Sequence, residues 1–188
     1  MATPKKELRL LLVPKFDLSD DDFGEGSGYA MGNTLKGYFT SCIQTTKFTS
    51  VDFWYDADAK SVTSDDLVCY LVFKPSRSVV QARGCTEALG AGGTTWWSVR
   101  DNAMISEVYF EATRGDANRT TLLANLIYHE WMHNRLDAGM HEYQDVHATP
   151  RGVLTTGGPI SGRMAPNAVD ITAMRRGLHH PIKQYAGW

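Results

Sequence analysis

The stretch NRTTLLANLIYHEWMHNRLDA, residues 118–138, is the longest uninterrupted helical pattern in this chain of 188 residues. No proline falls inside it, Asp116 or Asn118 can cap its first turn, and Gly139 can end it in a left-handed conformation. One face repeats at the three- and four-residue spacing of a helix and carries Leu122, Leu126, His129, His133 and Leu136. We therefore expect one long helix whose buried face includes two histidines.

Residues 129–133, HEWMH, match the HExxH pattern of zinc hydrolases. Because His129 and His133 are one helical turn apart, both imidazoles can reach a single tetrahedral zinc ion. Glu130 is rotated by about 100° around the helix, where its carboxylate can take a proton from a coordinated water. Two core histidines held by hydrogen bonds, or a structural metal, would leave Glu130 without a role. We predict a catalytic zinc site with His129 and His133 as ligands and Glu130 as general base.

A catalytic zinc ion needs a third protein ligand, and the residues after the helix offer several. We favour His141, because a chain reversal at Gly139 would swing its imidazole back over the metal. Asp137 lies one turn beyond His133, and its short side chain reaches the metal poorly from there. The alternatives to the favoured ligand are His147, Asp137, Glu142 and Asp145.

Composition and charge argue against two kinds of partner. Hydrophobic residues make up 43% of the chain and charged residues 21%, and the length suits one domain spanning residues 1–188. A formal net charge of −2 gives no basic surface for nucleic acid or for an anionic membrane. Residues 8–13 are too few to span a bilayer, and Arg9 and Pro14 favour a strand there over a signal peptide. We expect a monomer with no nucleic acid or membrane partner.

The order of elements predicts an α+β fold. Strand-like segments, rich in β-branched and aromatic residues, occupy residues 7–13, 50–56, 66–74 and 104–112. Helical spacing also marks residues 29–46 and 168–178. The Gly- and Thr-rich residues 84–95 indicate a long irregular loop, and Glu107 and Glu111 suggest that the strand at 104–112 lies at a sheet edge. We expect a mixed sheet with helices packed against it.

Three cysteines cannot all pair within the chain, and none has CxxC spacing. Cys42 and Cys69 lie in apolar segments, where we expect them to be buried. Cys85 lies in a Gly-rich segment and is the expected exposed thiol. Free thiols of this kind favour a reducing compartment.

The chain resembles the metzincin clan of zinc metallopeptidases, whose long motif is HExxHxxGxxH with a Met-turn downstream. HEWMH matches the first half of that motif directly, and HNRLDAGMHE, residues 133–142, is similar to the second half with two extra residues. Leu136 stands where the clan has its glycine, and Gly139 where it has its third histidine. With the two extra residues, the resemblance places Gly139 near the turn and His141 at the third-ligand position.

A second similar motif is SGRMAPNAVDITAMRRGL, residues 161–178. Met164, followed by Ala165-Pro166 and a helix, is similar to the Met-turn and C-terminal helix of the clan, which implies that Met164 lies under the metal. The resemblance implies a metzincin-like zincin fold, with an N-terminal subdomain at about 1–139 and a C-terminal one at about 140–188. The clan's edge strand lies antiparallel to bound substrate, so the candidate peptide-binding residues in this chain are Ser106, Glu107, Val108 and Tyr109.

These motifs predict a zinc metalloendopeptidase, with Zn²⁺ as cofactor and a peptide or protein as substrate. Two alternatives use the same scaffold differently. One is a zinc-dependent amidase that acts on a non-protein amide, and the other is a catalytically inactive binding module. Metal content and the activity of a Glu130→Gln variant would separate the three.

Overall fold

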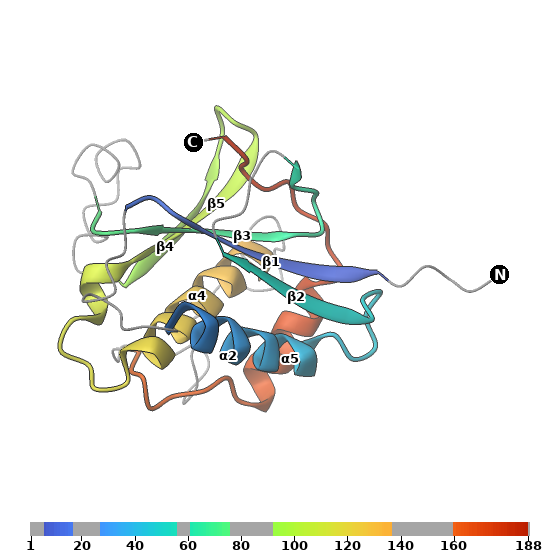
Figure 1. Cartoon of the computed structure of the whole chain (residues 1–188). Coiled ribbons are helices and arrows are strands. Elements are labelled where there is room, and N and C mark those ends of the chain that lie inside the picture. The colour runs from blue at the N-terminus through green and yellow to red at the C-terminus, as the bar shows by residue number, and fades with distance from the viewer. Residues whose placement is uncertain (1–5, 17–26, 56–60, 76–91, 137–159, 188) are drawn as a thin grey trace.

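The computed structural model describes residues 6–16, 27–55, 61–75, 92–136 and 160–187. Within these residues, five strands form one sheet and three α-helices lie together on one side of it (Figure 1). The elements are β1 (Glu7–Pro14), α2 (Ser27–Cys42), β2 (Ser50–Tyr55), β3 (Leu67–Val72), β4 (Gly93–Ser98), β5 (Ala103–Tyr109), the 3-10 helix η3 (Phe110–Thr113), α4 (Arg119–Leu136) and α5 (Ala168–Gly177). None of the helices described here has the length and apolar run needed to cross a membrane. The predicted α+β class with a mixed sheet is confirmed.

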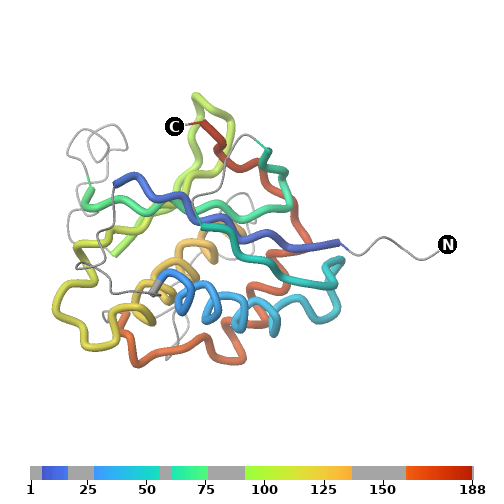
Figure 2. Tube along the Cα trace, viewed as in Figure 1, coloured from blue at the N-terminus to red at the C-terminus, as the bar shows by residue number. Residues whose placement is uncertain are grey.

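The sheet has the strand order β2-β1-β3-β5-β4, in which β4 runs antiparallel to β5 and all other neighbours are parallel. The N-terminal strand β1 lies between β2 and β3, as the trace in Figure 2 also shows. Leu8, Leu10 and Leu12 pack in the cluster shared with the helices, whereas Leu11 and Val13 pack in a second cluster. A strand covered on both faces needs a continuous apolar run, which explains the sequence of β1.

Helix α4 packs against the sheet and against the other two helices. It contacts β3, β4 and β5 as well as α2 and α5. Its residues are therefore buried almost all the way round, and within α4 those that keep partial exposure are Arg119, Thr120, Thr121 and His133. The sequence predicted that one face of this helix would be buried. Most of its surface is buried instead, because α2 and α5 cover the sides that the sheet does not contact. Polar side chains on every side of α4 must find partners inside the protein.

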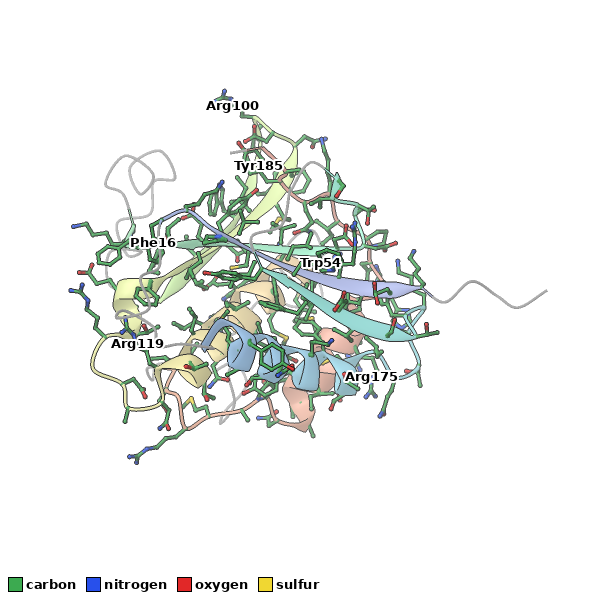
Figure 3. All side chains as sticks on the ribbon, viewed as in Figure 1. Phe16, Trp54, Arg100, Arg119, Arg175 and Tyr185 are labelled. Carbon is green, nitrogen blue, oxygen red and sulfur yellow. The ribbon has the colours of Figure 1, made fainter. Side chains whose placement is uncertain are left out.

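The C-terminal part returns to the sheet after α5. A capping box formed by Asn167 and Asp170 begins that helix. The segment that follows runs beside β5, where the N–H and C=O of Met104 both bond to its backbone. Figure 3 shows Tyr185 of this segment near the β4–β5 hairpin. The same segment carries Gln184, 4% exposed, into contact with α4.

Most of the predicted elements are confirmed at their positions, with α2 ending at Cys42 rather than at residue 46. The predictions for residues 84–112 are partly wrong. Residues 93–95, expected at the end of a loop, begin strand β4, and residues 110–112 belong to η3 rather than to a strand. The strand at 103–109 is interior, because β3 and β4 pair with its two sides. Glu107, expected to protect an exposed edge, is 2% exposed.

Candidate metal centre and general base

Helix α4 presents His129 and His133 to a common point. Their Nε2 atoms lie 3.1 Å apart, and their rings meet edge to face with 4.7 Å between centroids. His129 is 7% exposed and His133 is partly exposed. Two imidazole nitrogens on one tetrahedral zinc ion, each about 2.0–2.1 Å from it, are separated by roughly 3.3 Å. The observed separation therefore fits two ligands of a single zinc ion.

Both imidazoles and Glu130 line one cavity of about 270 Å³. The other residues around it are 92–95, at the start of β4, together with the apolar side chains of Leu126 and Ile160. A concave lining in which several polar side chains converge beside apolar ones is typical of substrate sites. The cavity is the strongest candidate for an active site among the described residues.

Strand β4 holds the predicted general base. The Thr95 hydroxyl lies 2.7 Å from Oε2 of Glu130 and 2.9 Å from the backbone oxygen of the same residue. A hydroxyl donates more strongly to a charged carboxylate than to a neutral carbonyl, so the contact with Oε2 is the stronger one. Glu130 is 4% exposed, and its carboxylate is therefore held by the protein rather than by bulk water.

The close approach of β4 to α4 depends on two glycines. A Cβ atom at Gly93 would lie 2.7 Å from Oε1 of Glu130 and 2.6 Å from the backbone oxygen of Glu107. A Cβ atom at Gly92 would lie 2.4 Å from Cδ2 of Leu126. Favourable contacts between carbon atoms need about 3.5–4.0 Å. The glycines that suggested a loop in the sequence are what allow a strand to form this wall of the cavity.

The predicted third ligand lies outside the described residues. His141 and the alternatives His147, Asp137, Glu142 and Asp145 all fall in the range 137–159. Among the residues that the structure does describe, no group of three or more His, Cys, Asp or Glu side chains could hold a metal ion. Within that part of the chain the arrangement is a pair of imidazoles, and the third ligand stays a prediction.

Met164 is fixed against α4 through its backbone. Asn125, one turn before His129, donates from Nδ2 to the carbonyl oxygens of Ser161 and Met164, each 2.9 Å away. The Tyr38 hydroxyl in turn donates to Oδ1 of Asn125 across 3.0 Å. The segment that carries the Met-turn-like motif is thus bonded to the histidine helix. That Met164 lies beneath a metal stays a prediction.

The strand that the sequence proposed as a peptide-binding edge is not an edge strand. Each of the four candidates, Ser106, Glu107, Val108 and Tyr109, is 2% exposed or less. Because β5 is paired on both sides, it has no free backbone edge for an extended peptide. The expectation of an edge strand at these residues is wrong. The sheet edge beside the cavity belongs to β4.

Two residues of the site, Gly93 and Thr95, were not found from the sequence. The segment GTTWWS, residues 93–98, does contain the β-branched and aromatic residues that favour a strand. That signal was obscured by the preceding glycines. Even a correct strand prediction would not have shown the contact of Thr95 with Glu130, because the two residues are 35 positions apart.

Cys69 of β3 lies close to the site but is a neutral packing residue. Burial raises the pKa of its thiol well above the usual range, and the nearby carboxylates of Glu130 and Glu107 raise it further. Since the thiolate is the form that binds metal, Cys69 acts as a small buried hydrophobe. Cys42 is likewise buried, as predicted, and Cys85 lies outside the described residues.

Comparison of the chain with known proteins found no match among protein families, curated proteins or solved structures. What the site can do is therefore inferred from its own residues and their geometry.

Proposed function

We propose that this chain is a zinc-dependent metallopeptidase of metzincin-like fold that hydrolyses peptide bonds. The observation that carries the proposal is the 3.1 Å separation of the His129 and His133 Nε2 atoms at a cavity that Glu130 also lines. The antiparallel strand β4, packed against α4 at the edge of an otherwise parallel sheet, supports the fold assignment. His141 as third ligand and Met164 beneath the metal belong to the same proposal.

When bound, zinc would lower the pKa of water toward about 7 and polarise a substrate carbonyl. The residues of the chain supply the proton transfers and the geometry. Glu130 accepts the proton of the attacking water and can pass it to the leaving amine. Thr95 keeps the carboxylate of Glu130 in place, so that it does not have to reorient during the reaction.

We infer that an extended substrate binds along β4. This strand lies at the edge of the sheet and lines the cavity through residues 93–95, together with Gly92 just before it. A peptide can add to such an edge through main-chain hydrogen bonds, which would carry its scissile bond past the two histidines. Trp97, 43% exposed on the same strand, adds apolar surface of the kind that binding sites use. The proposal keeps the predicted addition of an extended peptide to a sheet edge, but assigns it to β4 instead of β5.

The first test is metal binding. Purified protein loaded with Zn²⁺ should retain one ion per chain, and an anomalous-scattering map at the zinc edge should show a peak touching His129 and His133. The same map would identify the third ligand. A chain that stays metal-free under loading, or imidazoles that face separate environments, would contradict the proposal.

The second test is hydrolysis of a fluorescent peptide library by the wild type and by Glu130→Gln. Loss of the base should lower the rate by at least about 10²-fold while zinc is retained. Glu111→Gln is the matched control, because Glu111 is exposed on η3 and pairs with Arg114. Hydrolysis of non-protein amides but not of peptides would favour the amidase. A zinc-loaded wild type that hydrolyses neither would favour the binding module.

A further inference from the structure

A series of hydrogen-bonded polar side chains leads from Gln184 to Glu130, and Thr95 is the member that contacts the carboxylate. Oγ1 of Thr95 lies 2.7 Å from Oε2 of Glu130 and 3.0 Å from Oγ of Ser106. Nδ2 of Asn134 lies 3.0 Å from the same Ser106 oxygen. Asn134 and Gln184 then exchange two amide hydrogen bonds of 2.9 and 3.0 Å. The chain joins β4, β5, α4 and the C-terminal segment.

Two backbone groups set the direction of donation along this chain. Nε2 of Gln184 donates to the carbonyl oxygen of Ile182 across 3.0 Å, and Oε1 of Gln184 accepts from the N–H of Val68 at 3.5 Å. With the Gln184 amide fixed in this way, Asn134 must accept through Oδ1 and donate through Nδ2. The second Nδ2 hydrogen of Asn134 is then the one that reaches Ser106.

The single hydrogen of each hydroxyl follows from this direction. Thr95 has one hydrogen for three contacts, and the shortest of them is with Oε2 of Glu130 at 2.7 Å. If Thr95 donates there, its 3.0 Å contact with Ser106 is left to the hydrogen of Ser106, which itself accepts from Asn134. Thr95 then accepts from Ser106 and gives its one hydrogen to Oε2 of Glu130, its shortest contact with that residue and the charged one. We call Gln184, Asn134 and Ser106 the donor chain. Gln184 and Asn134 donate to each other, and from Asn134 onward each donation points toward the carboxylate.

We propose that Thr95 is a positioning residue, whose hydroxyl, oriented by the donor chain, holds the Glu130 carboxylate at the cavity. Its catalytic consequence rests on the proposed function, whereas the orienting contact needs neither metal nor substrate. The three members of the donor chain are 4% exposed or less, and Glu130 is 4% exposed. In such surroundings aligned hydrogen bonds polarise and strengthen one another. A valine would fill nearly the same volume as Thr95, so the hydroxyl is the feature that matters.

The orienting contact is tested first in metal-free protein, by a double-mutant cycle read as Tm. Thr95→Val should lower Tm in the wild-type background and lower it less in a Glu130→Ala background, where the acceptor is gone. Thr95→Ser should stay near the wild type, and Ser106→Ala should weaken the coupling between Thr95 and Glu130. Equal shifts in both backgrounds would overturn the proposal, whether or not the chain is a peptidase.

The catalytic consequence is tested with zinc-loaded protein and the best peptide from the library. Thr95→Val should lower kcat by about tenfold or more, with KM and zinc affinity nearly unchanged, and Thr95→Ser should restore most of the rate. Thr40→Val is the control, because the Thr40 hydroxyl bonds to Lys36 within α2. Unchanged kcat, or a loss confined to zinc binding, would overturn the role. If the wild type hydrolyses no peptide, the proposed function fails, and the metal-free cycle still decides the orienting contact.

Discussion

Two groups of polar side chains on α4 are both largely buried but make different contacts. One group lines a single cavity and consists of His129, Glu130 and His133. The other group consists of Asn125 and Arg135, which donate to backbone carbonyl groups away from that cavity. Asn134 belongs to the donor chain instead. Both groups belong to the same 18-residue helix. Burial of a polar residue therefore does not mark a functional site, whereas convergence of several polar residues on one cavity does.

Arg135 shows how the second group is held. Its guanidinium is 1% exposed and donates to four carbonyl oxygens, those of Ser64, Asp65, Asp66 and His180. Burial lowers the pKa of Arg135 to about 10, so the side chain is still charged at neutral pH. These bonds join the end of α4 to the start of β3 and to the segment after α5. The role of Arg135 is to connect elements, not to act on a ligand.

The largest expected effect in this comparison is on stability. Arg135→Met should lower the free energy of unfolding by about 3–5 kcal/mol, because the buried carbonyl group of Asp66 and three partly buried ones lose their donor. Zinc bound per folded chain should not change. Urea unfolding would measure the first quantity and metal analysis the second. Arg163→Met, at an exposed position, should stay within about 0.5 kcal/mol of the wild type. Loss of zinc from folded Arg135→Met would remove the distinction between the two groups.

For the group that lines the cavity, we expect a large effect on zinc binding and a small effect on stability. His133→Ala should weaken zinc binding by about 10²-fold or more, since even second-shell changes cost 10–100-fold. The free energy of unfolding of the metal-free protein should change by about 1 kcal/mol or less, because His133 is partly exposed and fills little of the core. Competition with a zinc chelator measures the affinity. Unaltered affinity would mean that this imidazole is not a ligand.

A smaller effect on stability is expected from a substitution that disturbs the close packing of β4 against Glu130. Gly93→Ala should lower the free energy of unfolding by about 1–3 kcal/mol, because the new methyl group overlaps Glu130 and the backbone of Glu107. Gly37→Ala in α2 is the matched control, since nothing lies within 4 Å of its added Cβ. That change should raise stability by about 0.5–1 kcal/mol. Equal effects at the two glycines would show that β4 does not press on Glu130.

The smallest effect concerns Cys42, the last residue of α2, whose thiol contacts the hydroxyl of Tyr128 on α4. Burial raises the pKa of Cys42 to about 11, with a hydrogen bond to Tyr128 acting in the opposite direction. At pH 8 about one thiol in 10³ is ionised, so alkylation by iodoacetamide should be about 10²-fold slower or more in native than in unfolded protein. Mass spectrometry of the Cys42 peptide gives both rates, and equal labelling would contradict burial.

The same shift sets a direction for alkaline stability. The pKa of Cys42 is higher in the folded state than in the unfolded chain. The contribution of its neutral thiol to the free energy of unfolding is therefore complete below pH 9 and is lost as the pH rises from 9 toward 11. Cys42→Ala should therefore flatten the decline of stability over that range. Thermal unfolding at several pH values measures it.

The motif at 129–133 could be predicted from the sequence because its geometry is local. Residues four apart on a helix lie on the same face, so the pairing of His129 with His133 needed no knowledge of the rest of the fold. Strand β1 was predictable for a related reason, since a continuous apolar run is what a strand buried on both faces requires. The α+β class followed from the order of such local signals.

The position of β4 could not be predicted in the same way. Gly93 at its start and Gly92 just before it have no side chains to signal a strand, and the close packing that they allow depends on α4 lying beside them. The interior position of β5 also depends on β4, because a strand becomes interior when a neighbour pairs with its free edge. Because β4 was not predicted, the sequence suggested that Glu107 lies on an exposed edge.

By itself the sequence determined which residues share a helical face, and so placed two imidazoles and a carboxylate at one end of the same helix. The tertiary structure decided which strand faces them and which side chain holds the carboxylate. Thr95, Ser106 and Gln184 come from three separate parts of the chain, and their bonds exist once the sheet and the C-terminal segment have packed around α4. Helical spacing acts over a few residues, whereas the wall of a cavity is set by contacts between segments far apart in the chain.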